Sequence, residues 1–125
     1  MLFYYCSNRT VQKPDPLVLK PARDPFREDN PPVIPALYAN SEPQWFYGVN
    51  AHEFTLRPFA KVLDMSNKMY LLMRHDIGYR AGLFDAAKRA GYVALRKKQS
   101  EGDTSLVVLN FDFIEGWKLS ENKCQ

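Results

Sequence analysis

Basic side chains gather in one part of this sequence, where they could contact a polyanion. Residues 57–98 carry ten lysines and arginines against three acidic residues, a local net charge of +7. The rest of the chain carries seven basic and eleven acidic residues, a net charge of −4, and the whole chain has a formal net charge of +3. Such clusters are typical of nucleic-acid-binding proteins, because several cations together attract the phosphate backbone. The candidate nucleic-acid-binding residues are Arg57, Lys61, Asn67, Lys68, Arg74, Arg80, Lys88, Arg89, Arg96, Lys97 and Lys98.

Side chains that could carry catalytic or metal chemistry are few. His52 and His75 are the two histidines, and neither has cysteines or carboxylates at the spacing of a metal site. His75 stands beside Asp76 and could form a catalytic pair, although such a pair is more often part of a helix end. The six glycines are scattered singly, so the sequence contains no glycine-rich phosphate loop. We therefore expect no enzyme, no metal site and no cofactor.

Length and composition indicate a chain that can bury one hydrophobic core. Of the 125 residues, 46% are hydrophobic and 14% are aromatic. No apolar run approaches the roughly 18 residues of a membrane span. Cys6 and Cys124 lie near opposite ends and could form a bridge, but two reduced thiols better suit a sequence without a cysteine framework. We expect a cytoplasmic protein without a membrane partner.

The N-terminal part of the chain differs in composition from the rest. Residues 2–6 form an aromatic-rich apolar run that predicts a short buried strand. Eight of the nine prolines lie between residues 7 and 43. This density predicts an extended arm, because proline fixes φ and disfavours helix. The arm could be a packed irregular extension, or it could bind a protein partner or a second copy in a homodimer. We therefore divide the chain into residues 1–47, the strand and arm, and residues 48–125, the globular part.

Two short helices are predicted in the basic segment. Thr55 is a suitable N-cap, and Pro58 then falls in the first turn, where its missing N–H costs little. Ser66 is a second N-cap candidate and opens a helix that runs to about His75. Residues 69–73 are apolar in succession, so a buried strand is the alternative for this second segment.

A third helix and a β-hairpin are predicted next. Residues 79–90 have helical periodicity, and Gly91 is suited to end the helix. The apolar stripe of this helix is Tyr79, Leu83, Ala86, Ala87 and Ala90, with Phe84 at its edge. Residues 92–98 and 105–111 then alternate as the two strands of a hairpin.

Together these elements resemble a winged helix-turn-helix DNA-binding domain over residues 55–111. Ala60 matches the small residue at which the first two helices touch, and Asp64 stands where the family usually has a glycine. The run Arg89–Val93 matches the end of the third helix before the wing. The apolar positions of the family are matched by Phe59, Leu63, Met65, Tyr70 and Met73.

The resemblance implies an α+β fold, a small winged-helix-like domain with a C-terminal hairpin and the proline-rich arm. A third core helix would come from residues 33–40 or 48–53. The helix after Ser66 would enter the major groove of duplex DNA. The residues nearest the bases or phosphates would be Asn67, Lys68 and Arg74. The protein would then be a DNA-binding transcription regulator or accessory factor, with RNA as the other possible nucleic acid.

A protein-interaction module is the alternative hypothesis. If residues 69–73 form a strand, the element order becomes β-α-β-β and the fold a sandwich. Glu101 and Asp103 at the hairpin tip favour this hypothesis, because a wing that grips phosphate should not carry two acids. The protein would then be an inhibitor or assembly factor whose basic surface binds an acidic protein partner.

Overall fold

Seven strands form a single sheet in the computed structural model, which describes residues 1–15, 35–44, 48–99 and 102–120. The strands are β1 (Phe3–Ser7), β2 (Leu37–Asn40), β3 (Asn50–Leu56), β4 (Val62–Asp64), β5 (Ala94–Lys98), β6 (Thr104–Val108) and β7 (Ile114–Leu119). The helices are α1 (Asn67–His75) and α2 (Ile77–Arg89), with a 3-10 helix at Phe111–Phe113. The expected helix-rich winged-helix-like fold is therefore wrong, since most of the described elements are strands.

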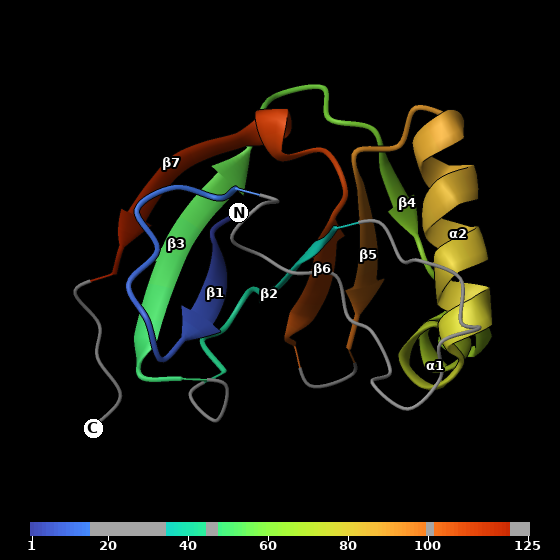
Figure 1. The fold of residues 1–125 in the computed structure, drawn as a ribbon, viewed down its shortest axis with the longest axis horizontal. Coiled ribbons are helices and arrows are strands. Elements are labelled where there is room, and N and C mark those ends of the chain that lie inside the picture. The colour runs from blue at the N-terminus through green and yellow to red at the C-terminus, as the bar shows by residue number, and fades with distance from the viewer. Residues whose placement is uncertain (16–34, 45–47, 100–101, 121–125) are drawn as a thin grey trace.

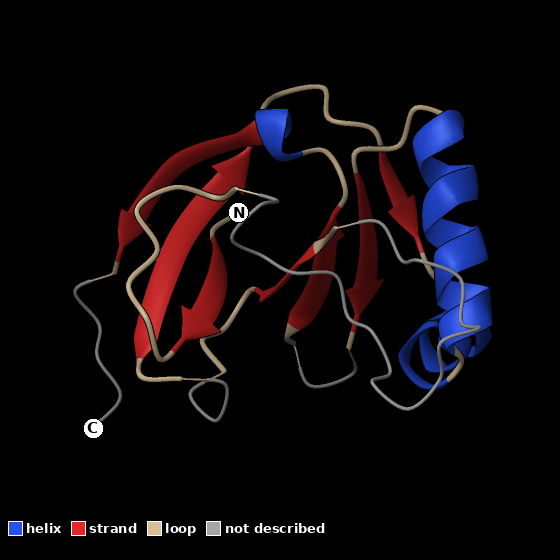
Figure 2. Ribbon diagram, in the orientation of Figure 1, coloured by secondary structure: helices blue, strands red, loops and turns tan. Residues whose placement is uncertain are grey.

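The sheet has the strand order β4-β5-β6-β2-β1-β3-β7 and curls into a half-barrel (Figure 1). Neighbouring strands are antiparallel except β4 and β5, which are parallel. A parallel pair needs a long crossover connection, and α1 and α2 supply it. Figure 2 shows α1 and α2 beside the β4–β5 end of the sheet, while the short 3-10 helix at Phe111–Phe113 leads into β7.

The predicted first helix of the basic segment is the main error in the sequence interpretation. The chain forms β3 up to Leu56, turns, and forms β4 from Val62. The segment forms a strand because its side chains alternate between the two faces of the sheet, so that Phe54 points into the core and pairs with Phe3 of β1. Pro58 then stands in the turn, and the N–H of Ala60 donates to the carbonyl of Arg57 at 3.3 Å.

The segments proposed for a third core helix are also strands where the structure describes them. Leu37–Asn40 is β2, and Asn50–Leu56 is β3. The alternative sandwich fits better than the winged helix, because a mostly β architecture is what forms. Its assumption that residues 69–73 are a strand is wrong, since they lie inside α1.

Three predictions that rest on local signals are confirmed. The Ser66 side chain accepts the N–H of Met69 at the start of α1. Gly91 follows α2 with a φ of 87°, a left-handed conformation that suits glycine at this position. The hairpin of β5 and β6 pairs Lys98 with Thr104.

The buried face of α2 differs from the predicted stripe. Phe84 and Ala87 are its buried residues, whereas Ala86 and Ala90 are exposed. The large apolar surface of Phe84 decides the orientation, because burying an aromatic ring stabilises more than burying an alanine methyl group.

Two hydrophobic clusters lie on opposite faces of the sheet. Alternation along β6 sends Leu106 and Val108 to one face and Val107 to the other. The first cluster, which we call the strand core, includes Phe3 and Phe54. The second, the helix core, contains the side chains that α1 and α2 bury against the sheet. The helix core ends where the helices stop covering the sheet, and this boundary forms the candidate site.

Candidate functional site

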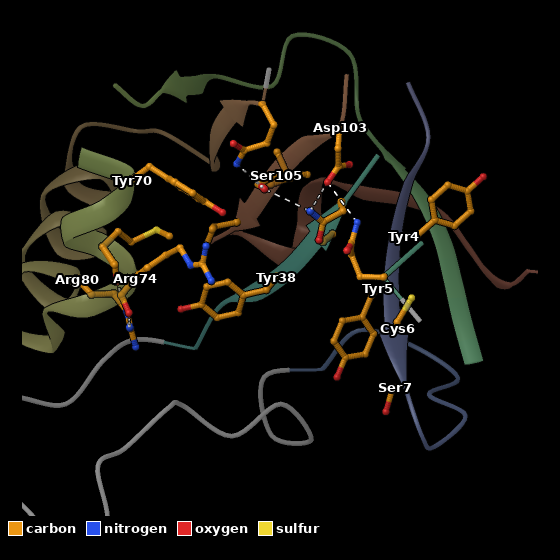
Figure 3. A pocket seen from close by; sticks show the side chains of 17 residues that line it. Tyr4, Tyr5, Cys6, Ser7, Tyr38, Tyr70, Arg74, Arg80, Asp103 and Ser105 are labelled. Carbon is orange, nitrogen blue, oxygen red and sulfur yellow. Dashed lines mark hydrogen bonds between the residues drawn. The ribbon is translucent and has the colours of Figure 1, made fainter. Parts of the chain in front are cut away.

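A cleft of about 730 Å³ lies where the helices meet the uncovered strands. This volume is within the range of small-molecule binding sites. Figure 3 shows side chains from α1, α2 and β2 on one side of the cleft and from β1 on the other. Prominent among the described lining residues are Tyr4, Tyr38, Tyr70, Arg74, Arg80 and Ser105.

Aromatic side chains enter the cleft from separate parts of the chain. Tyr38 lies on β2 opposite Val107, so it shares the helix-covered face of the sheet. Its side chain is 44% exposed, and its ring centroid lies 6.5 Å from that of Phe84. Tyr70 projects from α1 and is partly buried against the helix core. The cleft thus offers tyrosine rings that keep part of their surface accessible.

Two arginines lie beside these rings at the junction of α1 and α2. The Nε of Arg80 donates to the carbonyl of Met73 at 2.7 Å, and its Nη2 donates to the carbonyl of Arg74 at 2.9 Å. These carbonyls belong to the last turn of α1, which has no helical partners for them, so Arg80 caps the helix. Arg74 places its guanidinium carbon 5.6 Å from the centroid of Tyr70.

The two arginines of the cleft form no ion pair with another residue that the structure describes. Within the described residues, no carboxylate lies at ion-pair distance from Arg74 or Arg80. Burial raises the pKa of Tyr38 above its ordinary value, while the positive charge of Arg80 acts in the opposite direction. The Tyr38 hydroxyl is therefore protonated at neutral pH and available as a donor beside these guanidinium groups.

An aspartate holds the polar end of the cleft together. The Asp103 carboxylate accepts hydrogen bonds from the side chains of Asn40 at 2.9 Å and Ser41 at 3.0 Å. It also accepts from the backbone N–H of Glu42 and the side chain of Gln44. Asp103 thus ties the hairpin to the segment after β2, and it does not project from a tip as the interaction hypothesis assumed. Glu101, the other predicted tip acid, lies outside the described residues.

The cleft brings together two of the eleven predicted nucleic-acid-binding residues, Arg74 and Arg80. Three other arginines lie beside carboxylates. Arg57 is 3.8 Å from Glu115, Arg89 is 3.1 Å from Asp85, and Arg96 is 2.7 Å from Asp64. The sequence count of basic residues therefore overstates the charge that is open to a ligand.

The remaining predicted residues are dispersed. The Nζ of Lys61 donates to the carbonyl of Ala90 at 2.8 Å and lies 4.4 Å from the ring centroid of Tyr92. The Nζ of Lys97 donates to the carbonyl of Lys98 at 2.7 Å, at the end of β5. Asn67 and Lys68 are exposed in the first turn of α1, and Lys88 is exposed in the last turn of α2.

Neither histidine belongs to the cleft. His52 is fully buried against the strand core, where its Nε2 accepts the N–H of Val11 at 2.9 Å. Its Nδ1 lies 3.1 Å from the carbonyl of Tyr5 and donates to it. Burial lowers the pKa of His52, so the ring is neutral at neutral pH. His75 ends α1, and the neighbouring Asp76 accepts the N–H of Tyr79 as the N-cap of α2.

Sequence reasoning missed the tyrosines and polar residues of the cleft. Tyr4 was part of a run assigned to a buried strand, and Tyr38 was part of the proline-rich arm. A usable signal was the alternation in Leu37–Asn40, where Leu37 is buried in the strand core and Tyr38 faces the helices. The cleft itself needs β1 and β2 to pair in the middle of the sheet, which no local pattern predicts.

Among the described residues there is no group of three histidine, cysteine or acidic side chains that could hold a metal ion. No helix in the described part is long and apolar enough to cross a membrane. Comparisons with families of known proteins, with curated proteins and with solved structures gave no match.

Proposed function

We propose that this protein binds a nucleotide-containing ligand in the cleft. The phosphate lies beside Arg74 and Arg80, and the base packs against Tyr38 or Tyr70. The observation that carries the proposal is that two arginines without an ion-pair partner among the described residues meet accessible tyrosine rings in one cleft.

Arginine geometry supports the phosphate position. A guanidinium has five N–H donors in a planar fork, which matches phosphate oxygens. Arg80 directs two of its nitrogens to carbonyls of α1, and these bonds fix its orientation. Arg74 contacts the ring of Tyr70, and its side chain forms no ion pair with another residue of the described part. One arginine is thus held by the helix end and the other is free to close on a phosphate.

Tyrosine rings support the base position. Aromatic side chains bind nucleotide bases by stacking, and each stacked base contributes about 1–3 kcal/mol. Tyr38 and Tyr70 supply such rings close to the arginines, as Figure 3 shows. A ligand with a base and a phosphate, either a free nucleotide or a unit of a single strand, satisfies both sets of groups.

The surroundings of the other cations favour this ligand over duplex DNA. A duplex requires a continuous row of basic side chains and keeps its bases stacked inside the helix. Arg57, Arg89 and Arg96 instead lie beside their own carboxylates in separate elements. The nucleic-acid hypothesis is therefore retained for unpaired nucleotides and not for duplex recognition by α1.

Calorimetric titration at low salt tests the proposal with three ligands: a nucleoside diphosphate, a short single strand and a duplex of the same sequence. Binding of either unpaired ligand and weaker binding of the duplex are expected. Arg74→Ala should weaken binding roughly tenfold to a hundredfold, because a charge-assisted hydrogen bond contributes about 1.5–3 kcal/mol. Lys88→Ala removes an exposed cation outside the cleft and serves as the matched control. Absence of binding to all three ligands, or equal losses in both variants, would contradict the proposal.

A further inference from the structure

The turn between β3 and β4 exposes an aromatic residue completely. Phe59 is 103% exposed, and its φ of 64° makes it the one non-glycine residue with positive φ in the described part of the chain. Bulky side chains rarely adopt this conformation, and such strain is concentrated at functional positions. The turn is held at both ends, since Arg57 donates its N–H to Phe113 and Ala60 donates to Arg57. The backbone therefore holds Phe59 outward against both conformational preference and the hydrophobic effect.

A groove of about 280 Å³ lies beside this turn, on the strand-core side of the sheet. Phe59 is one of its lining residues. The other apolar lining residues are Met1, Phe3, Leu56, Ala60, Val62 and Leu106. Met1 is 78% exposed, so the apolar surface continues from the groove onto the outside of the protein. An apolar anchor and an apolar socket thus lie next to each other on one surface.

The charges at the rim of this groove balance each other. Arg96 and Asp64 form a bidentate pair at 2.7 and 3.1 Å. Arg57 lies 3.8 Å from Glu115, too far for a hydrogen bond, and both side chains are about half exposed. A rim that carries both signs is poorly matched to a polyanion or to a strongly acidic partner. It is well matched to a surface with the same charges, because a two-fold rotation can place Arg57 of one copy against Glu115 of the other.

We infer that this surface binds a second copy of the chain, with Phe59 of each copy in the groove of the other. A two-fold interface uses the same patch on both subunits, so anchor and socket must be neighbours, as they are here. Buried aromatic anchors carry much of the binding energy in such interfaces. This interface lies on the strand-core face and is separate from the nucleotide cleft, which lies on the helix-covered face.

Analytical ultracentrifugation of the full chain, from micromolar to millimolar concentration, tests the inference. The wild type should change from monomer to dimer as its concentration rises. Phe59→Gly should weaken dimerisation roughly thirtyfold or more, as loss of an interface anchor does. Glycine accepts positive φ, so the thermal midpoint of the monomeric variant should not fall, which separates lost dimerisation from unfolding. Leu71→Ser removes another exposed apolar side chain, on α1 and outside the groove, and should leave dimerisation unchanged.

A charge exchange provides a second readout. Arg57→Glu and Glu115→Arg should each weaken the dimer, and the double variant should recover it, because the pair across the interface is restored with its signs reversed. A wild type that stays monomeric over the whole range overturns the inference. Dimerisation that survives Phe59→Gly at wild-type strength overturns it equally.

Discussion

Arg74 and Arg96 belong to the same basic segment but have opposite surroundings. Arg96 lies on β5, where the parallel pairing with β4 places Asp64 directly opposite it. Arg74 lies at the end of α1, over the ring of Tyr70, and has no ion-pair partner among the described residues. The difference shows that the fold, more than the count of basic residues, decides which charges can meet a ligand.

The two faces of the sheet also differ in what they offer to a ligand. On the helix-covered face, α1 and α2 stop short of β1 and leave a cleft with cations and tyrosines. On the other face, His52, Phe54 and Trp117 pack together, with ring centroids 5.2 Å apart for His52 and Trp117 and 5.7 Å for Phe54 and Trp117. Close aromatic packing fills the β3–β7 part of that face, whereas incomplete helix cover leaves the cleft on the first.

The largest expected loss of stability comes from truncating a core residue on which the positions of both Arg74 and Arg96 depend. Leu95 precedes Arg96 on β5 and is fully buried in the helix core with Met73, the neighbour of Arg74. Leu95→Ala should lower the free energy of unfolding by about 2–5 kcal/mol, because the truncation leaves a cavity. Chemical denaturation measures this loss. The control is Leu71→Ala at an exposed position, which should change the free energy of unfolding by no more than about 0.5 kcal/mol. A loss at Leu95 no larger than the control would show that this side chain does not pack in the helix core.

A smaller effect should separate the aromatic part of the cleft from its charge. Tyr38→Ala should weaken nucleotide binding by about 1–3 kcal/mol if the ring stacks on the base. Tyr38→Phe keeps the ring and should retain most of the affinity. Calorimetric titration of both variants measures the difference. Equal affinity for the alanine variant and the wild type would remove Tyr38 from the site.

His52 provides a pH-dependent test of this aromatic packing. Burial lowers the pKa of His52 below the ordinary value of 6.5 because it disfavours the charged ring, while the hydrogen bond to the Tyr5 carbonyl acts in the opposite direction. The neutral ring accepts the N–H of Val11. Its contribution to stability is therefore fully present above about pH 6.5 and is lost as the pH falls through the lowered pKa. His52→Gln should reduce this loss in denaturation curves measured from pH 8 downward. The exposed His75→Gln is the control, and identical pH profiles for all three proteins would exclude His52 as the cause.

The smallest expected loss of stability concerns Arg96, the arginine that is paired with Asp64. Hydrogen bonding to Arg96 lowers the pKa of Asp64. The pair therefore stabilises the fold at pH values above the usual pKa of an aspartate, and this stabilisation is lost as the pH falls through the lowered pKa. Asp64 is 65% exposed, and such pairs contribute about 0.2–1 kcal/mol. Asp64→Asn should therefore cause a small loss of stability at neutral pH and none at strongly acid pH. The variant should not gain nucleotide affinity, because Arg96 lies outside the cleft.

Local patterns in the sequence were sufficient for half of the architecture. Capping by Ser66, the glycine at position 91 and the alternation of the hairpin predicted α1, α2, β5 and β6, and the apolar run at residues 2–6 predicted β1. The segment before Ser66 was misread because β3 and β4 form through pairing with β1, β7 and β5, which are distant in sequence. A segment with apolar residues and suitable capping residues can match either the helical or the strand periodicity when the strands that pair with it are unknown.

The cleft was predictable only in part for the same reason. Arg74 and Arg80 stand close together in the sequence and were both among the candidates. Tyr4 and Tyr38 reach the site through the central position of β1 and β2 in the sheet. The pairing of Asp64 with Arg96 also depends on this long-range arrangement, so the neutralisation of one cation could not be foreseen.

The most direct measurement of the central claim is a nuclear magnetic resonance titration of the isotope-labelled protein with a short single-stranded oligonucleotide at low salt. The side-chain signals of Arg74 and Arg80 and the ring signals of Tyr38 and Tyr70 should shift and saturate together. The signals of Arg96 and Asp64 should stay in place. Shifts gathered on Arg96 and its neighbours on β5, with the cleft signals unchanged, would contradict the claim.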